Sequence, residues 1–143
     1  MGAVALLDER REHIMRLERV LRGLEDATDA KDFETRHHFA PGAYAREILL
    51  PAGSLVVGKI HRHAHVNVVS FGRALVATPD GVTEIHAPYT FISQPGTKRV
   101  VLALTDVVWT TVHVTDETDL EKIEAAVIAP SFDALPAPQE LLP

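Results

Sequence analysis

Three histidines in one short stretch are the residues of this sequence best suited to chemistry. His61, His63 and His65 stand two residues apart, and Asn67 continues the interval. Successive side chains of a strand alternate between its faces, so a strand here would direct all four to one side, roughly 6–7 Å apart. Neutral imidazole is a common ligand of divalent transition metals, so the spacing predicts a metal site completed by a facing strand. A metal-free polar pocket and a structural or surface role are the alternatives.

The composition excludes several other kinds of site. The 143-residue chain contains no cysteine, which excludes disulfides, zinc–thiolate sites and cysteine nucleophiles. Its formal net charge is -6. Nucleic acids and anionic membranes require clustered positive charge, so neither is an expected partner. No apolar run approaches the roughly 20 residues that span a bilayer. We therefore expect a soluble, cytoplasmic protein of one domain.

The elements that would position the histidines belong to four regions. Apolar residues recur at three- and four-residue steps between Ile14 and Leu24, which predicts an amphipathic helix. A second helical pattern follows Thr115 or Asp116, either of which can cap it, and Pro130 ends it. The expected regions are an N-terminal helix (1–32), a β-barrel (33–116), a short C-terminal helix (117–129) and a Pro-rich tail (130–143).

The barrel region is rich in Val, Ile, Thr and aromatic residues and is broken by short turns. Asp80-Gly81 between two such runs is a strong hairpin signal. Thr105-Asp106 predicts a second hairpin, between the last two strands. The expected strands are 45–50, 55–69 (one long strand or a bent pair), 73–78, 82–86, 91–93, 99–104 and 107–114. Short strands at regular spacing indicate a sandwich or barrel, because closing a sheet removes its edges.

The order of these residues resembles the cupin family. The first cupin motif has a glycine, a His-x-His pair, a carboxylate and a second glycine; here His61-Arg62-His63 or His63-Ala64-His65 supplies the pair and Gly72 the closing glycine. Pro95-Gly96-Thr97-Lys98-Arg99 resembles the turn of the second motif. The resemblance spans roughly residues 44–115 and also extends to small cupin proteins of phages. It implies an all-β double-stranded β-helix, a jelly-roll barrel.

The sequence departs from the family pattern at two ligand positions. The expected carboxylate is replaced by His65 or Asn67, and the histidine of the second motif by Arg99. The hairpin at residues 105–106 would bring His113 beside Lys98 and Arg99 and into the barrel.

The predicted site has two parts. The predicted metal ligands are His61, His65 and His113, with His63 able to replace one of them. The metal would be divalent iron, zinc, nickel or manganese. The predicted ligand-binding residues are Lys98, Arg99 and Asn67, where the two cations suit a carboxylate or phosphate.

Three functions follow from the resemblance. The first is a metal-binding cupin that is an enzyme acting on a small oxygenated or carboxylate substrate. The second is a non-catalytic cupin that binds a small molecule, which the missing ligands favour. The third is a structural or assembly protein of phage type that uses the barrel as a scaffold. The resemblance also implies a homodimer or a higher homo-oligomer. We rank the metal-binding cupin first, the ligand-binding cupin close behind it and the scaffold third; the resemblance does not choose a reaction, since a fold does not determine an activity.

Overall fold

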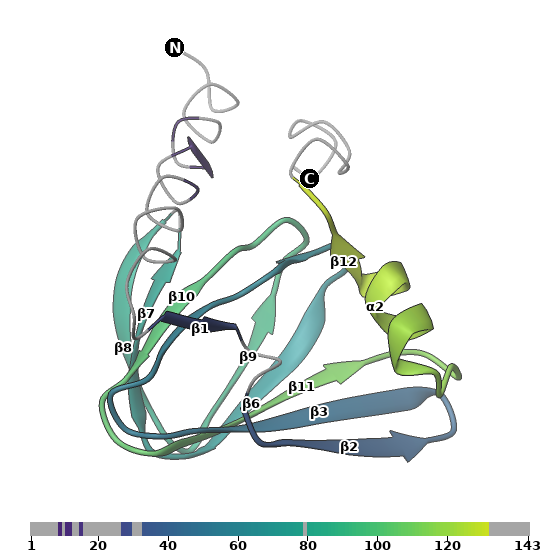
Figure 1. The fold of residues 1–143 in the computed structure, drawn as a ribbon, viewed down its shortest axis with the longest axis horizontal. Coiled ribbons are helices and arrows are strands. Elements are labelled where there is room, and N and C mark those ends of the chain that lie inside the picture. The colour runs from purple at the N-terminus through teal and green to yellow at the C-terminus, as the bar shows by residue number, and fades with distance from the viewer. Residues whose placement is uncertain are drawn as a thin grey trace.

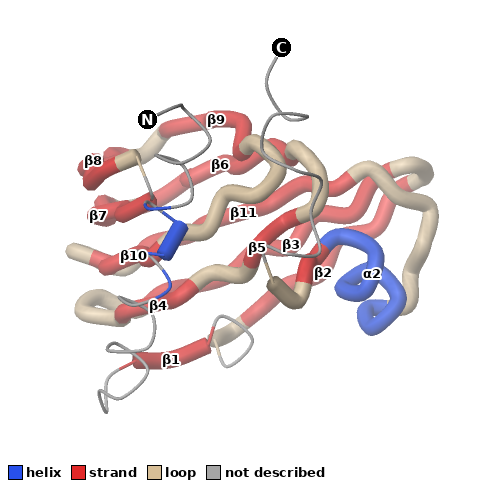
Figure 2. Tube along the Cα trace, turned by 90° about the horizontal axis from the view of Figure 1, so that it is seen from above, coloured by secondary structure: helices blue, strands red, loops and turns tan. Residues whose placement is uncertain are grey.

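The structure, a computed structural model, is built from two facing β-sheets and a short helix (Figures 1 and 2). It describes residues 33–78 and 80–131, the strand at 27–29, and residues 9, 11, 12 and 15, which are helical. Most of the expected N-terminal helix (1–32) and of the Pro-rich tail (130–143) therefore lies outside the described residues. No helix in the described part of the chain is long and apolar enough to cross a membrane.

Each of the two large sheets has five strands, mostly antiparallel. In order across the first sheet these are β1 (Ala27–Asp29), β4 (Leu55–Val57), β10 (Val100–Ala103), β7 (Arg73–Thr78) and β8 (Gly81–His86). In order across the second they are β2 (Thr35–Ala40), β3 (Ala43–Leu50), β11 (Val107–His113), β6 (His65–Phe71) and β9 (Tyr89–Ser93). A third sheet contains only β5 (Ile60–His61) and β12 (Ile128–Ala129), and α2 spans Leu120–Val127.

The core lies between the facing sheets. The second sheet contributes Leu50, Val69, Val107 and Trp109, and the first contributes Val56, Ala74, Val76, Ile85, Val101 and Ala103. Inward residues alternate with outward ones along each strand, as in β6, where His65, Asn67 and Val69 are buried. Apolar side chains thus fill part of the space between the sheets, and His65, Asn67 and His113 of β6 and β11 line the pocket beside them.

The prediction of a hairpin between the last two barrel strands is wrong. β10 pairs with β4 and β7 in the first sheet, whereas β11 pairs with β3 and β6 in the second. The connecting turn crosses between the sheets and is held by both neighbours: Thr105 Oγ1 accepts from Arg73 N at 3.0 Å and Asp106 Oδ1 accepts from Ala52 N at 2.8 Å. Crossing lets both strands bury an apolar face in the same core, which a flat hairpin does not allow.

The stretch expected as one long strand or a bent pair forms three strands, β4, β5 and β6. The chain leaves strand geometry at residues 62–64, where it bends towards the C-terminal segment. Arg62 N donates to Val127 O at 2.7 Å, and Arg62 Nε donates to Ile128 O at 3.0 Å. His63 therefore lies in an exposed bend. The expectation that His61, His63, His65 and Asn67 share one strand face holds only for the last two.

Other elements also differ from the sequence analysis. The strands β1 and β2 were not expected: β1 lies within the region expected to be the N-terminal helix, and β2 precedes the first expected barrel strand. The C-terminal helix is shorter than 117–129 and is capped by Asp119, whose carboxylate accepts from Glu121 N and Lys122 N. The two expected caps are used elsewhere: Thr115 Oγ1 accepts from Glu117 N, and Asp116 Oδ1 accepts from Gly42 N.

Gly72, between β6 and β7, provides a test of this packing. Its φ is +91°, and a Cβ there would lie 1.9 Å from the carbonyl oxygen of Asp106. Gly53 has a similar φ of +85°, but a Cβ there meets nothing within 4 Å. Backbone strain alone costs about 1–2 kcal/mol. We expect Gly53→Ala to lose about that much free energy of unfolding and Gly72→Ala clearly more, by urea denaturation. Equal losses in the two variants would contradict the close approach of the crossing turn.

Candidate functional site

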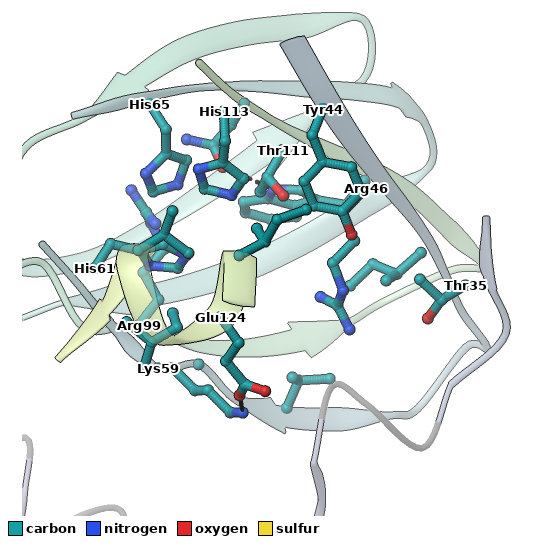
Figure 3. A pocket seen from close by; sticks show the side chains of 18 of the residues that line it. Thr35, Tyr44, Arg46, Lys59, His61, His65, Arg99, Thr111, His113 and Glu124 are labelled. Carbon is teal, nitrogen blue, oxygen red and sulfur yellow. Dashed lines mark hydrogen bonds and ion pairs between the residues drawn. The ribbon is translucent and has the colours of Figure 1, made fainter. Parts of the chain in front are cut away.

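A pocket of about 380 Å³ opens between the sheets at the end of the barrel covered by α2 (Figure 3). Its inner walls are mainly apolar, since they include Ile48, Leu50, Val56, Val101 and Trp109. Its polar lining comes from β2, β3, β5, β6, β11 and α2 and from the residues beside β5 and β10. Volumes of roughly 300–1,000 Å³ with few polar groups are typical of small-molecule sites.

Three imidazoles from three strands meet in this pocket: His61 of β5, His65 of β6 and His113 of β11 (Figure 3). The ring centroids of His61 and His65 are 4.2 Å apart, those of His65 and His113 5.0 Å, and those of His61 and His113 5.6 Å. β6 and β11 are neighbours in the second sheet, with Val66 paired to Val112, so the adjacent His65 and His113 project to the same side. His113 thus reaches the cluster through β6, and not through the hairpin that the sequence suggested.

The three imidazoles are neutral at physiological pH. Burial lowers the pKa of His61 to about 3, with His65 and His113 adding to the effect, and lowers that of His113 to about 4. Burial also lowers the pKa of His65. Taking imidazole out of water disfavours its charged form, and a second positive charge nearby would repel it. Neutral imidazole is the form that ligates metal ions.

Two ring nitrogens in the cluster are buried and have no hydrogen-bond partner among the described residues: Nδ1 of His61 and Nε2 of His65. Buried polar atoms without partners are rare in native structures and call for an explanation, such as an ion or a ligand. As the side chains lie, no group of three or more His, Cys, Asp or Glu residues in the described part of the chain is arranged to hold a metal ion. The rings of His61 and His113, for example, stack at an interplanar angle of 13°. The donor set nevertheless fits a divalent transition metal, because each of the three neutral imidazoles offers one nitrogen lone pair. Two of the ring nitrogens have no other partner among the described residues.

A buried hydrogen-bond chain leads from the pocket floor to a cation. Trp109 Nε1 donates to Asn67 Oδ1 at 3.0 Å, Asn67 Nδ2 donates to Ser93 Oγ at 2.6 Å, and Arg99 Nη2 donates to the same oxygen. The guanidinium carbon of Arg99 also lies 5.1 Å from the centre of the Phe91 ring. Burial lowers the pKa of Arg99 to about 10, so the group stays charged at neutral pH. These hydrogen bonds hold the positive charge of Arg99 near His61 and His65.

The remaining sequence-predicted residues lie in different surroundings. Arg99 and Asn67 line the pocket, but the amide of Asn67 is already bonded to Trp109 and Ser93. Lys98 is 6% exposed and does not line the pocket. His63 is exposed in its bend and likewise does not line it.

Sequence reasoning missed three charged residues that line the pocket: Arg46, Lys59 and Glu124. Of the three, Arg46 had a signal in the sequence. It stands two residues from both Tyr44 and Ile48 on β3, so the three side chains share one face of the strand. Lys59 and Glu124 had none, since they are 65 positions apart and meet only when α2 folds over the barrel.

The chain was compared with protein-family models, curated proteins and solved structures. No family model matches the sequence, and no curated protein does. Among solved structures, ectoine synthase from P. lautus superposes with a TM-score of 0.56 at 15% identity, over 75% of this chain and 81% of that one. A variant of salicylate 1,2-dioxygenase from Pseudoaminobacter salicylatoxidans has a TM-score of 0.56 at 15% identity, over 84% of this chain and 35% of that one.

A third match is a cupin superfamily protein from Desulfitobacterium hafniense, with a TM-score of 0.52 at 7% identity, over 68% of this chain and 88% of that one. At such identities the likeness establishes the fold and leaves the activity open. The expected all-β double-stranded β-helix is confirmed.

The lowered pKa values predict an acid-sensitive protein. Each buried imidazole has a folded-state pKa below its usual 6.5, so the unfolded state binds more protons below pH 6.5 and stability falls as pH falls towards 4. Between pH 7 and pH 5 we expect chelator-treated protein to lose on the order of 1–2 kcal/mol of unfolding free energy for each of His61 and His113. The His113→Asn variant should lose less over the same interval, as measured by urea denaturation. An identical pH slope in the two proteins would contradict a neutral, buried His113.

Proposed function

We propose that this chain, which has the cupin fold, binds one divalent transition metal through His61, His65 and His113 and acts with it on a small oxygenated or carboxylate substrate. The observation that carries the proposal is the convergence of three neutral imidazoles from three strands in one pocket. Two of them have a ring nitrogen without a hydrogen-bond partner in the described part of the chain. Burial of neutral nitrogen donors without a mutual hydrogen bond is an arrangement that a metal ion would stabilise.

The pocket residues would divide the work between ion and substrate. The imidazoles of His61, His65 and His113 would hold the metal, which would supply Lewis-acid chemistry at its open coordination positions. Arg99 attracts an anionic group, and its orientation is fixed by Ser93 and by the Phe91 ring. The apolar walls formed by residues such as Val101 and Trp109 keep water from the site and strengthen these charge interactions.

A second candidate, a metal-free pocket that binds an organic anion without turnover, is favoured by one specific observation. Arg46, Lys59 and Arg99 line the pocket, and among the described residues that line it only Glu124 carries a carboxylate. With neutral histidines the lining therefore has an excess of positive charge. That excess suits an anion with or without a metal, so the two candidates differ in the metal alone.

Metal content distinguishes the two candidates. We expect untagged protein, reconstituted in turn with iron, zinc, nickel or manganese and then dialysed, to retain about one ion per chain by elemental analysis. The His61→Ala/His65→Ala/His113→Ala variant should retain none, because no set of three nitrogen donors is left in the pocket. The matched control is His63→Ala, which removes an exposed imidazole from the same stretch and should retain the ion.

Two results would count against the metal site. Wild-type protein that holds none of the four ions would remove the metal from the proposal and leave the anion-binding pocket. Stoichiometric metal in a His61→Ala/His65→Ala double variant would show that the ion binds elsewhere on the chain.

A further inference from the structure

An ion pair between two distant parts of the chain forms part of the pocket lining. Lys59 precedes β5, and Glu124 lies in α2; the Lys59 ammonium contacts the Glu124 carboxylate (Figure 3). Both residues line the pocket together with Leu120, Ile123 and Val127 of the same helix. The carboxylate of Glu124 thus belongs to the lining of the pocket as well as to the helix surface.

A second cation lies on the same side of the pocket. Arg46 projects from β3, where it is paired with Thr111 of β11, and its side chain points into the pocket (Figure 3). Burial lowers the pKa of Arg46, while the negative charge of Glu124 acts in the opposite direction. Glu124 therefore contacts Lys59 directly and lies near enough to Arg46 for the two charges to interact.

The ion pair between Lys59 and Glu124 is easily exchanged. The side chain of Lys59 is 44% exposed and that of Glu124 is 53% exposed. Ion pairs exposed to this degree contribute little to stability, because water screens the charges and two long side chains must be ordered. A carboxylate arriving from solution can replace Glu124 without disturbing Ile123, the residue that buries α2 against the barrel.

We infer that Arg46 and Lys59 form an anion subsite, that Glu124 occupies it as an internal competitor, and that the ligand is a small carboxylic acid with a compact apolar body. The ligand's carboxylate would take the place of the Glu124 carboxylate, and its opposite end would extend towards His61, His65 and His113. A carboxylate is favoured over phosphate because a carboxylate occupies this place in the structure. An apolar body is favoured because Ile48, Leu50 and Val101 form the adjacent walls.

This inference deepens the proposed function in that the ligand shares the pocket with the metal site, yet it can be tested separately. The probe is benzoate, and benzamide is its neutral counterpart of nearly equal shape, so the difference between them isolates the charge. Binding is measured by titration calorimetry on the full chain, with the metal content of each protein recorded. The lone tryptophan, Trp109, lines the pocket and provides a fluorescence signal for the same titration.

The variants should shift benzoate affinity in opposite directions. Glu124→Gln removes the internal competitor and should bind benzoate about tenfold more tightly, whereas Arg46→Met and Lys59→Met should bind it about tenfold more weakly. Benzamide affinity should stay within about twofold in all of them, because it carries no charge for the subsite to recognise. Lys59 is largely exposed, so its variant keeps the test informative if Arg46→Met does not fold.

Matched controls separate a local effect from a change in overall charge. Glu121→Gln and Lys122→Met make the same charge changes on α2 outside the pocket lining, and neither should alter benzoate affinity. Equal benzoate affinity in wild type, Glu124→Gln and Lys59→Met would overturn the inference, as would benzamide following the same trend. If the trends hold in protein that retains no metal, the subsite stands and the metal proposal fails; if metal is retained without the trends, the reverse is true.

Discussion

The antiparallel pairing of β6 with β11 is the constraint on which the pocket depends. Val66 pairs with Val112, which sets His65 beside His113, and Asn67 pairs with Thr111 one step further along. A slip of one residue in β6 would turn His65 and Asn67 from the pocket to the outer face of the sheet. The positions of two imidazoles are thus determined by main-chain hydrogen bonds, and the aliphatic core on the same two strands holds that register.

The polar floor of the pocket is coupled to this core. Trp109 belongs to the buried cluster, yet its ring nitrogen begins the chain that ends at Arg99. A buried guanidinium is costly unless its donors are satisfied, so Asn67 and Ser93 have a structural role in addition to any contact with a ligand. The orientation of the cation beside the histidines is therefore inherited from core packing.

Sequence patterns predicted the fold class, most barrel strands and the three histidines that meet in the pocket. They failed where the outcome depends on partners distant in the chain. Two-residue periodicity cannot show that residues 62–64 bend towards β12, so His63 was expected on the wrong surface, and the turn at 105–106 does not show whether it reverses within a sheet or crosses between sheets. Lys59 and Glu124 carry no local signal at all, because only the docking of α2 brings them together. The role of the three histidines as metal ligands and that of Lys98 as an anion contact stay predictions.

The small sheet of β5 and β12 has a thermodynamic consequence. Ile128 pairs with His61 and Ala129 with Ile60, so the backbone of one pocket histidine is held by the segment that follows α2. Local unfolding of that segment would release His61. A molecule that binds only when His61 is held in place therefore lowers the population of the locally unfolded form. The coupling is reciprocal. A partner that stabilises the folded form of this segment would raise the affinity of the pocket for its ligand by the same factor by which the ligand raises the affinity for that partner. Folding of the segment after α2 and binding in the pocket are thus thermodynamically linked.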